Sequence, residues 1–392
     1  MDEKKARRPL SELYVTARMV VLCVLVAFII LFVAIGHNDM RAENFRYLIR
    51  YLDRSSFSAT GDFSTVYYKG KDPAFVMYKG ELAVLSDGTL TLFDSDGAAV
   101  MTAGVPKDAQ FASAQNESYI TLFSRSDGRV YVFNSFSSVF EADFSYIYSV
   151  FAFDDGYAIV SAGNGYRTEL TLYNKNFRAV YSLGTDNLIT SVFLADGTLY
   201  YAAAVSDVGG AMAGGTVDDG EIGAFDTGTG EAVFKSRIEG IPLAVYLSGG
   251  RLFAASTAGI YTFNDEGEAA GRLRMKVDNA FSDGGFAVTA ETGGNTCIIF
   301  AKNGRLYSGE CGSVTDVCFG EHLFVLSQSA VYRLTASDIY AETDGIPTYA
   351  AGIARTDVRS GGMRIFALSD SSVLFCGSGS AFPLDTADER TG

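Results

Sequence analysis

Residues 242–277 read PLAVYLSGG (242–250), RLFAASTAG (251–259), IYTFNDEGE (260–268) and AAGRLRMKV (269–277). Each of the first three segments has an apolar centre and ends in a cluster of turn residues, mostly Gly, Asn and Asp. Short apolar segments closed in this way are typical of β-strands joined by tight turns. The stretch therefore predicts four consecutive antiparallel strands.

The same pattern recurs along the chain at intervals of 33 to 54 residues. The units begin near Asp72, Asp108, Ser145, Asn187, Ile241, Lys276, Val314 and Pro347. A period of about 40 residues with four strands in each period is typical of a β-propeller blade. We predict an all-β, eight-bladed β-propeller, with seven blades as the alternative. A β-sandwich pair or a β-solenoid is the competing interpretation of the strand spacing.

The first strand of the ring is expected to complete the last blade. Residues 63–69 (FSTVYYK) precede the first full unit, whereas the eighth unit has strong strands at 363–368 and 372–376 and only a weak fourth segment. Pairing the first strand with the last blade removes the exposed edges of an open array. We therefore predict that residues 63–69 close the ring.

The N-terminal region contains an uncharged apolar run, Met19 to Gly36 (MVVLCVLVAFIILFVAIG). A helix of this length, at ~1.5 Å rise per residue, is close to the thickness of a bilayer core, which predicts a transmembrane helix. Residues 1–18 carry a net charge of +2, and basic flanks stay cytoplasmic. We predict a single-pass protein of the cell membrane with its N-terminus in the cytoplasm and the propeller outside. A cleaved signal peptide ending near Ala34 and Gly36 is the alternative.

Residues 40–54 (MRAENFRYLIRYLDR) place Phe45, Leu48, Ile49 and Leu52 on one face of a helix. This spacing predicts an amphipathic juxtamembrane helix, lying either on the membrane surface or beneath the β domain. The predicted organisation is a cytoplasmic basic tail (1–18), the transmembrane helix (19–36), the amphipathic helix with a linker (37–60), the propeller (61–386) and a C-terminal tail (387–392).

Charge and composition narrow the class of protein. The formal net charge of the whole chain is −15. Residues 55–392 have a net charge of −18, and the N-terminal region before them is basic. An acidic surface repels phosphate backbones, so we expect no nucleic-acid partner. A hydrophobic content of 48% is enough for a folded core and excludes disorder for most of the chain.

One unit resembles a known repeat. Residues 219–235 (DGEIGAFDTGTGEAVFK) contain a strand ending in Asp, a Thr-Gly turn and a second strand that begins with Glu and contains an aromatic residue. This pattern resembles the repeat of quinoprotein-like propellers, and residues 88–97 (GTLTLFDSDG) resemble it more weakly. In the pattern, Asp bonds the turn amides and Gly takes the positive-φ position.

The resemblance implies a scaffold and not an enzyme. Quinoprotein enzymes of this kind dock their repeats with Trp, stack pyrroloquinoline quinone on another Trp and clamp it with adjacent cysteines. This chain has no Trp and no adjacent cysteines, and Phe234 stands where a docking Trp would be. The resemblance therefore implies the non-enzymatic scaffold branch and no cofactor. The chain also resembles an uncharacterised family of bacterial single-pass, membrane-anchored propeller proteins.

Residue types with catalytic or metal-binding chemistry are few. The two histidines, His37 and His322, are too few for a His-based zinc site or an obvious Ser-His-Asp triad. The paired carboxylates Asp154-Asp155 and Asp218-Asp219 sit beside Gly, where Asp is favoured for its bonds to turn amides. We predict no catalytic residue and no metal site.

The five cysteines do not form a disulfide framework. Cys23 lies in the apolar run, and a two-residue turn at Asn303-Gly304 would set Cys297 opposite Glu310, with Cys311 on the other face. We expect buried thiols. A bridge between Cys297 and Cys311, or between Cys311 and Cys318, is the alternative.

The longest unit carries an insertion, residues 206–220 (SDVGGAMAGGTVDDG), between its second and third strands. In a propeller this position lies on the face of the blade-to-blade crossovers. Asp207, Asp218 and Asp219 supply acceptors, so a lid or partner-contact loop is one hypothesis and an insertion without a role is the other.

Two function classes follow. The first is a membrane-anchored, non-catalytic scaffold outside the cytoplasm that binds other envelope or membrane proteins or a ligand. The second is an extracytoplasmic carbohydrate-active enzyme or sensor that uses Asp and Glu in its central channel. At least three carboxylates in the channel would favour the second class, and an apolar or Ser/Thr-lined channel would favour the first.

Overall fold

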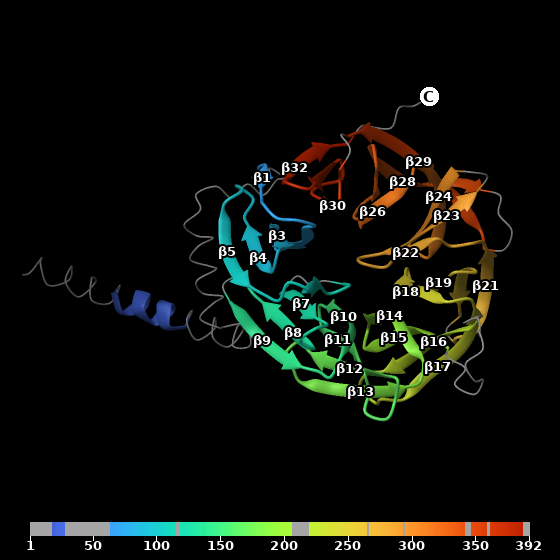
Figure 1. The fold of residues 1–392 in the computed structure, drawn as a ribbon, viewed down its shortest axis with the longest axis horizontal. Coiled ribbons are helices and arrows are strands. Elements are labelled where there is room, and N and C mark those ends of the chain that lie inside the picture. The colour runs from blue at the N-terminus through green and yellow to red at the C-terminus, as the bar shows by residue number, and fades with distance from the viewer. Residues whose placement is uncertain are drawn as a thin grey trace, which may run out of the picture. The chain divides into compact units, whose positions relative to one another are not determined.

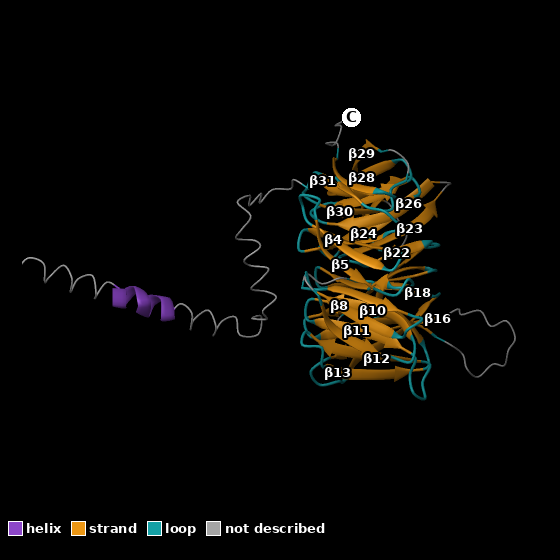
Figure 2. Cartoon of the chain, turned by 60° about the vertical axis from the view of Figure 1, so that its left-hand side comes forward, coloured by secondary structure: helices purple, strands orange, loops and turns teal. Residues whose placement is uncertain are grey.

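The computed structural model describes residues 18–27, 63–114, 118–135, 137–205, 219–264, 266–292, 295–341, 346–358 and 361–386. The chain divides into two compact units, Met1–Ala59 and Thr60–Gly392. All regular elements described in the second unit are strands (Figure 2).

The predicted fold class is wrong about a membrane-spanning helix. The described part of the first unit is a helix over residues 18–27. Within the described residues, no helix has the length and apolar character needed to cross a membrane. The rest of the predicted span (28–36) and the predicted amphipathic helix (40–54) lie outside the described residues.

The second unit is built from four-stranded antiparallel meanders in chain order. The first two are β2 (Ala74–Tyr78), β3 (Glu81–Ser86), β4 (Thr89–Phe93) and β5 (Ala99–Gly104), then β6 (Gln110–Phe111), β7 (Ile120–Ser124), β8 (Arg129–Phe133) and β9 (Ser138–Asp143). The third is β10 (Ile147–Phe153), β11 (Gly156–Ser161), β12 (Thr168–Asn174) and β13 (Ala179–Thr185). The fourth is β14 (Leu188–Ala195), β15 (Thr198–Ala204), β16 (Asp219–Asp226) and β17 (Ala232–Glu239). The fifth is β18 (Pro242–Ser248), β19 (Arg251–Ser256), β20 (Gly259–Phe263) and β21 (Ala269–Arg274).

The sixth and seventh meanders share one eight-stranded sheet, where eight separate sheets were predicted. They are β22 (Asn279–Phe281), β23 (Phe286–Thr292), β24 (Asn295–Lys302) and β25 (Arg305–Cys311), then β26 (Val314–Phe319), β27 (Leu323–Ser327), β28 (Ala330–Ala341) and β29 (Thr348–Asp357). The outer strands β25 and β29 pair in parallel, from Leu306 opposite Thr348 to Ser308 opposite Ala350. The reason is length: β28 has 12 residues and β29 has 10, so this hairpin extends past its own sheet to the neighbouring edge.

The assignment of Pro347 to the start of the last unit is also corrected. The strand that follows it, β29, is the fourth strand of the seventh meander, paired antiparallel with β28. The last sheet contains β30 (Arg364–Ala367), β31 (Ser372–Cys376) and β32 (Ser380–Asp385).

The predicted ring closure is confirmed. The strand β1 (Val66–Tyr67) joins the last sheet, with Val66 opposite Ala381 and Tyr67 opposite Ser380. Its neighbour in that sheet is β32, followed by β31 and β30. The Tyr68 hydroxyl donates to Gly377 O at 2.6 Å or Ser380 O at 2.9 Å, which adds a side-chain connection to the pairing.

The sheets surround a central axis, with β10, β14, β18 and β22 among the strands nearest to it (Figure 1). Second and third strands such as β3, β11 and β20 are buried at every position, whereas the outer strand β13 has only exposed and half-buried residues. A strand that is covered by a neighbouring sheet on both faces reads as a continuous apolar run. The core is therefore a series of apolar interfaces between successive sheets, such as the contact of Phe253 with Phe286, whose ring centroids are 5.8 Å apart.

Candidate functional site

The predicted contact loop is described only at its end. Asp207 and Asp218 lie outside the described residues. Asp219 is the first residue of β16, and its Oδ2 lies 3.6 Å from Arg237 Nη1, with both side chains more than half exposed. An exposed ion pair of this kind contributes little to stability. In its described surroundings, Asp219 makes a surface pair across the β16–β17 hairpin.

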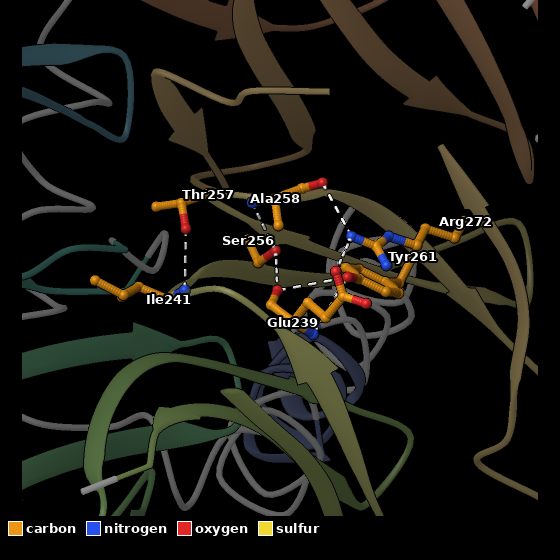
Figure 3. A network of polar contacts seen from close by, with 7 residues as sticks. All are labelled: Glu239, Ile241, Ser256, Thr257, Ala258, Tyr261 and Arg272. Carbon is orange, nitrogen blue, oxygen red and sulfur yellow. Dashed lines mark hydrogen bonds and ion pairs between the residues drawn. The ribbon is translucent and has the colours of Figure 1, made fainter. Parts of the chain in front are cut away.

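A denser polar network lies beside that hairpin, around Glu239 (Figure 3). Ser256 Oγ donates to Glu239 O at 2.6 Å, and Arg272 Nη2 donates to Glu239 Oε2 at 2.6 Å. The Glu239 amide donates to the Tyr261 hydroxyl at 3.2 Å, and the Arg272 guanidinium stacks over the Tyr261 ring.

This network has a structural role. Glu239 ends β17 of the fourth meander, and Ser256, Tyr261 and Arg272 belong to the fifth, so the contacts join two successive sheets. The Ile241 amide donates to Thr257 Oγ1 at 3.1 Å in the same crossover (Figure 3). The contacts pair groups of the two sheets with each other, whereas the buried Arg272 Nε has no hydrogen-bond partner among the described residues.

A cavity of about 320 Å³ lies around the central axis, at the end of the sheets opposite to Asp219 and Glu239. Its lining comes from five successive meanders, through residues 113–114, 151–155, 192–196, Tyr246 and 282–284. Antiparallel pairing puts the turn between a sheet's first and second strands opposite the turn between its second and third strands. This cavity, here called the channel-mouth cavity, therefore opens away from the end of the sheets at which Asp219 lies.

Four carboxylates line the channel-mouth cavity, together with aromatic side chains. The carboxylates are Asp154, Asp155, Asp196 and Asp283, and the lining contains no Lys or Arg. Phe151, Phe193 and Tyr246 supply the aromatic part, and Phe193 and Tyr246 have ring centroids 4.5 Å apart. The cavity thus combines negative charge with an apolar wall, which suits a cationic group or a polar ligand with an apolar face.

In sequence alone, Asp154-Asp155 are explained by turn chemistry, and Asp196 and Asp283 are not predicted as site residues. Asp196 does sit in a tight turn, with φ 48°, followed by Gly197 with φ 75°. The available signal was positional: an Asp occurs between the first and second strands of the third, fourth and sixth meanders. A local turn accounts for each Asp by itself, whereas closure of the ring brings these residues together at one cavity.

Arg364 links this cavity to a buried acid. Its Nη2 lies 3.2 Å from Asp283 Oδ2, and its Nε lies 3.9 Å from Asp316 Oδ2. Burial raises the pKa of Asp316 to about 6, against the opposing effect of Arg364. Asp316 Oδ2 also accepts a hydrogen bond from the Ile365 amide at 2.9 Å, which ties β26 to β30.

No histidine or cysteine is among the described lining residues of the channel-mouth cavity. His322 lies between β26 and β27, and His37 lies outside the described residues. Within the described ranges, no group of three His, Cys, Asp or Glu side chains is arranged to hold a metal ion. All five cysteines are free, and Cys297 stands opposite Glu310 in the predicted register. Burial raises the pKa of the Cys318 thiol to about 11, so this thiol stays protonated at neutral pH.

Comparison with solved structures identifies the architecture. BamB from Moraxella catarrhalis is similar with a TM-score of 0.53 and 12% identity, over 83% of this chain and 99% of that one. Sqt1 from Saccharomyces cerevisiae has a TM-score of 0.55 and 13% identity, over 84% of this chain and 100% of that one. The chain is a β-propeller.

A third propeller neighbour is apo AztD from Citrobacter koseri, with a TM-score of 0.51 and 10% identity over 76% of this chain and 88% of that one. In sequence, the chain matches no family model and no curated protein. At these identities the shared feature is the fold, and a propeller fold does not determine function. The functional argument therefore rests on the cavities of this propeller.

Proposed function

We propose that this protein is a non-catalytic binding scaffold that holds a partner protein at the mouth of its central channel. The observation that carries the proposal is the channel-mouth cavity, which five blades line and which contains four carboxylates, one of them, Asp283, paired with Arg364. Charge complementarity selects partners and speeds their association. The proposed partner accordingly presents a Lys or Arg side chain to this cavity.

The scaffold proposal also draws on the sequence. The chain has no Trp and no adjacent cysteines, and its repeat resembles the scaffold branch of the quinoprotein-like propellers. The loop containing Asp207, Asp218 and Asp219 stays a second, predicted contact region on the opposite face. Each face would then offer a separate contact surface.

Site-directed photocrosslinking in living cells tests the proposal. A photoreactive amino acid replacing Asp196 is expected to capture a partner, and the yield should fall several-fold when Asp154 and Asp155 are changed to Asn. The control places the same amino acid at Val180, an exposed position on the outer strand β13. Equal capture from both positions, or capture insensitive to Asp154→Asn and Asp155→Asn, would contradict the proposal.

A carbohydrate-active enzyme or sensor is the second candidate, and the four carboxylates of the channel-mouth cavity meet the condition that favours this class. Glycoside hydrolysis needs a protonated carboxylic acid beside an ionised one. Burial raises the pKa of Asp283, and Arg364 opposes that shift. Release of reducing sugar from a glycan by the full chain, abolished in Asp283→Asn with glycan binding retained, would favour the enzyme over the scaffold.

A location outside the cytoplasmic membrane, with envelope proteins as partners, stays a prediction that rests on the charge distribution of the N-terminal region. Protease added to intact cells or to cell-wall-free protoplasts is expected to reach the propeller. A propeller that becomes cleavable only after lysis would contradict this location.

A further inference from the structure

A second cavity, of about 620 Å³, lies where the fifth and sixth blades meet. It is lined by the turn between β18 and β19, by the turn between β24 and β25, and by residues 346–349 leading into β29. We call it the blade 5–6 groove. None of its lining residues lines the channel-mouth cavity.

The charge of the blade 5–6 groove is opposite to that of the protein around it. Its charged lining residues are Arg251 and Arg305, in a chain whose residues 55–392 carry −18. Arg251 directly follows one turn and Arg305 directly follows the other, because Ser248 pairs with Arg251 and Lys302 pairs with Arg305. The β18–β19 hairpin and the β24–β25 hairpin thus each place one arginine directly after the turn.

The two turns are in contact. A Cβ built on Gly304, the residue before Arg305, would lie 3.9 Å from Arg251 Cβ. A Cβ on Gly249 would lie 2.4 Å from the carbonyl carbon of Asn303, so glycine is required for this approach. The close packing places Arg251 beside the turn that Arg305 follows, and both residues line the groove.

Neither arginine side chain forms a buried ion pair with a described residue. The Arg251 side chain forms no hydrogen bond or ion pair with any residue that the structure describes. Arg305 Nη1 lies 3.6 Å from Asp338 Oδ1, whose side chain is 98% exposed, and its guanidinium stacks over Tyr349 with 5.2 Å to the ring centroid. Like charges held together repel unless an anion lies between them.

The turns add hydrogen-bond donors. Gly249 and Gly250 have φ of 54° and 76°, and Asn303 and Gly304 have φ of 52° and 74°. Among the described residues, the amides of these four donate to no other backbone group. Successive backbone amides in a turn conformation can form an anion-binding concavity. Tyr349 and Pro347 supply apolar surface at the same groove.

We infer that the blade 5–6 groove binds an organic anion, with its carboxylate or phosphate at Arg251 and Arg305 and its apolar body against Tyr349 and Pro347. Arginine suits this role because its planar donors match a carboxylate or phosphate in a bidentate manner. The site is separate from the proposed scaffold contact in position and in charge.

Calorimetric titration of the full chain with phenyl phosphate, benzoate and inorganic phosphate tests the inference. Saturable binding of phenyl phosphate or benzoate is expected, and the tighter of the two identifies the anionic group. Arg251→Gln should weaken that binding roughly ten-fold or more, because a charge-assisted hydrogen bond is lost. Tyr349→Ala should weaken binding of the aromatic ligand while leaving that of inorganic phosphate unchanged.

The matched control is Arg178→Gln, which removes one exposed positive charge just before β13 of the third blade. It is expected to leave the affinity unchanged, and far-ultraviolet circular dichroism verifies that each variant is folded. Absence of saturable binding by both aromatic anions would overturn the inference. An equal loss of affinity in Arg178→Gln and Arg251→Gln would also overturn it, because the effect would then be a general one of net charge.

Discussion

Among single residues, Asp316 is a buried acid whose effect on stability has a defined sign. Its side chain is 11% exposed, and burial raises its pKa to about 6, compared with ~3.9 in an unfolded chain. A group whose pKa is raised by folding stabilises the fold below the unfolded pKa and loses that contribution as pH rises through the folded value. The contribution of Asp316 to the stability of the propeller should therefore decrease as the pH rises from about 4 to about 7.

Asp316→Asn removes this titration and retains an oxygen for the Ile365 amide. At pH 8 we expect the free energy of unfolding to rise by about 1–3 kcal/mol, and at pH 4 to change by less than about 1 kcal/mol. Urea unfolding at both pH values measures the difference. Asp338→Asn, at a fully exposed site, is the control. A stability loss at pH 8 would show that the Arg364 ion pair outweighs the cost of burial.

Gly249 and Gly250 form a matched pair at one turn. Both have positive φ, so replacement by Ala strains the backbone at either position. A Cβ at Gly249 would also meet Asn303 and Gly304, whereas a Cβ at Gly250 meets nothing within 4 Å. We expect Gly249→Ala to cost about 1–3 kcal/mol more than Gly250→Ala, as overpacking does. Urea midpoints compare the two, and equal losses would mean that the contact between the turns is loose.

At the scale of elements, the closing strand β1 ties the two ends of the ring together. Val66 is fully buried and Phe63 is 6% exposed in the interface with the first and last sheets. Loss of such side chains costs ~1.5–3 kcal/mol each and leaves β32 as an unpaired edge.

A chain shortened to begin at residue 72 should therefore aggregate, or melt well below one that begins at residue 55. Thermal unfolding and size-exclusion chromatography compare them. Equal melting temperatures would show that the ring closes without β1.

For the whole molecule, the residue types present predict no quinone binding. The chain has no Trp and no adjacent cysteines, so pyrroloquinoline quinone lacks the groups that stack and clamp it in quinoprotein enzymes. Titration with this quinone and calcium is expected to leave the melting temperature unchanged. A saturable increase of several degrees would contradict the prediction, because a ligand that binds the native state raises its stability.

Local structure was predictable from the sequence because its causes are local. The Asn303-Gly304 turn sets the register that places Cys297 opposite Glu310, and an Asn-Gly pair favours that turn wherever it occurs. The period of four strands and the closing strand were also predictable, because apolar and polar residues alternate in the strands and turn residues separate them. The apolar run after Arg18 predicts a membrane-spanning helix, whereas within the described residues no helix is long and apolar enough to cross a membrane.

Only the tertiary structure decided which distant residues meet. Asp154, Asp196 and Asp283 are ordinary turn residues in sequence, and they share a cavity because the ring carries equivalent turns of successive blades to one axis. Arg251 and Arg305 become neighbours because two turns from different blades pack together. The parallel pairing of β25 with β29 depends on how far one hairpin extends beside the next sheet. Such contacts arise from closure of the whole ring, and no short stretch of sequence carries a signal for them.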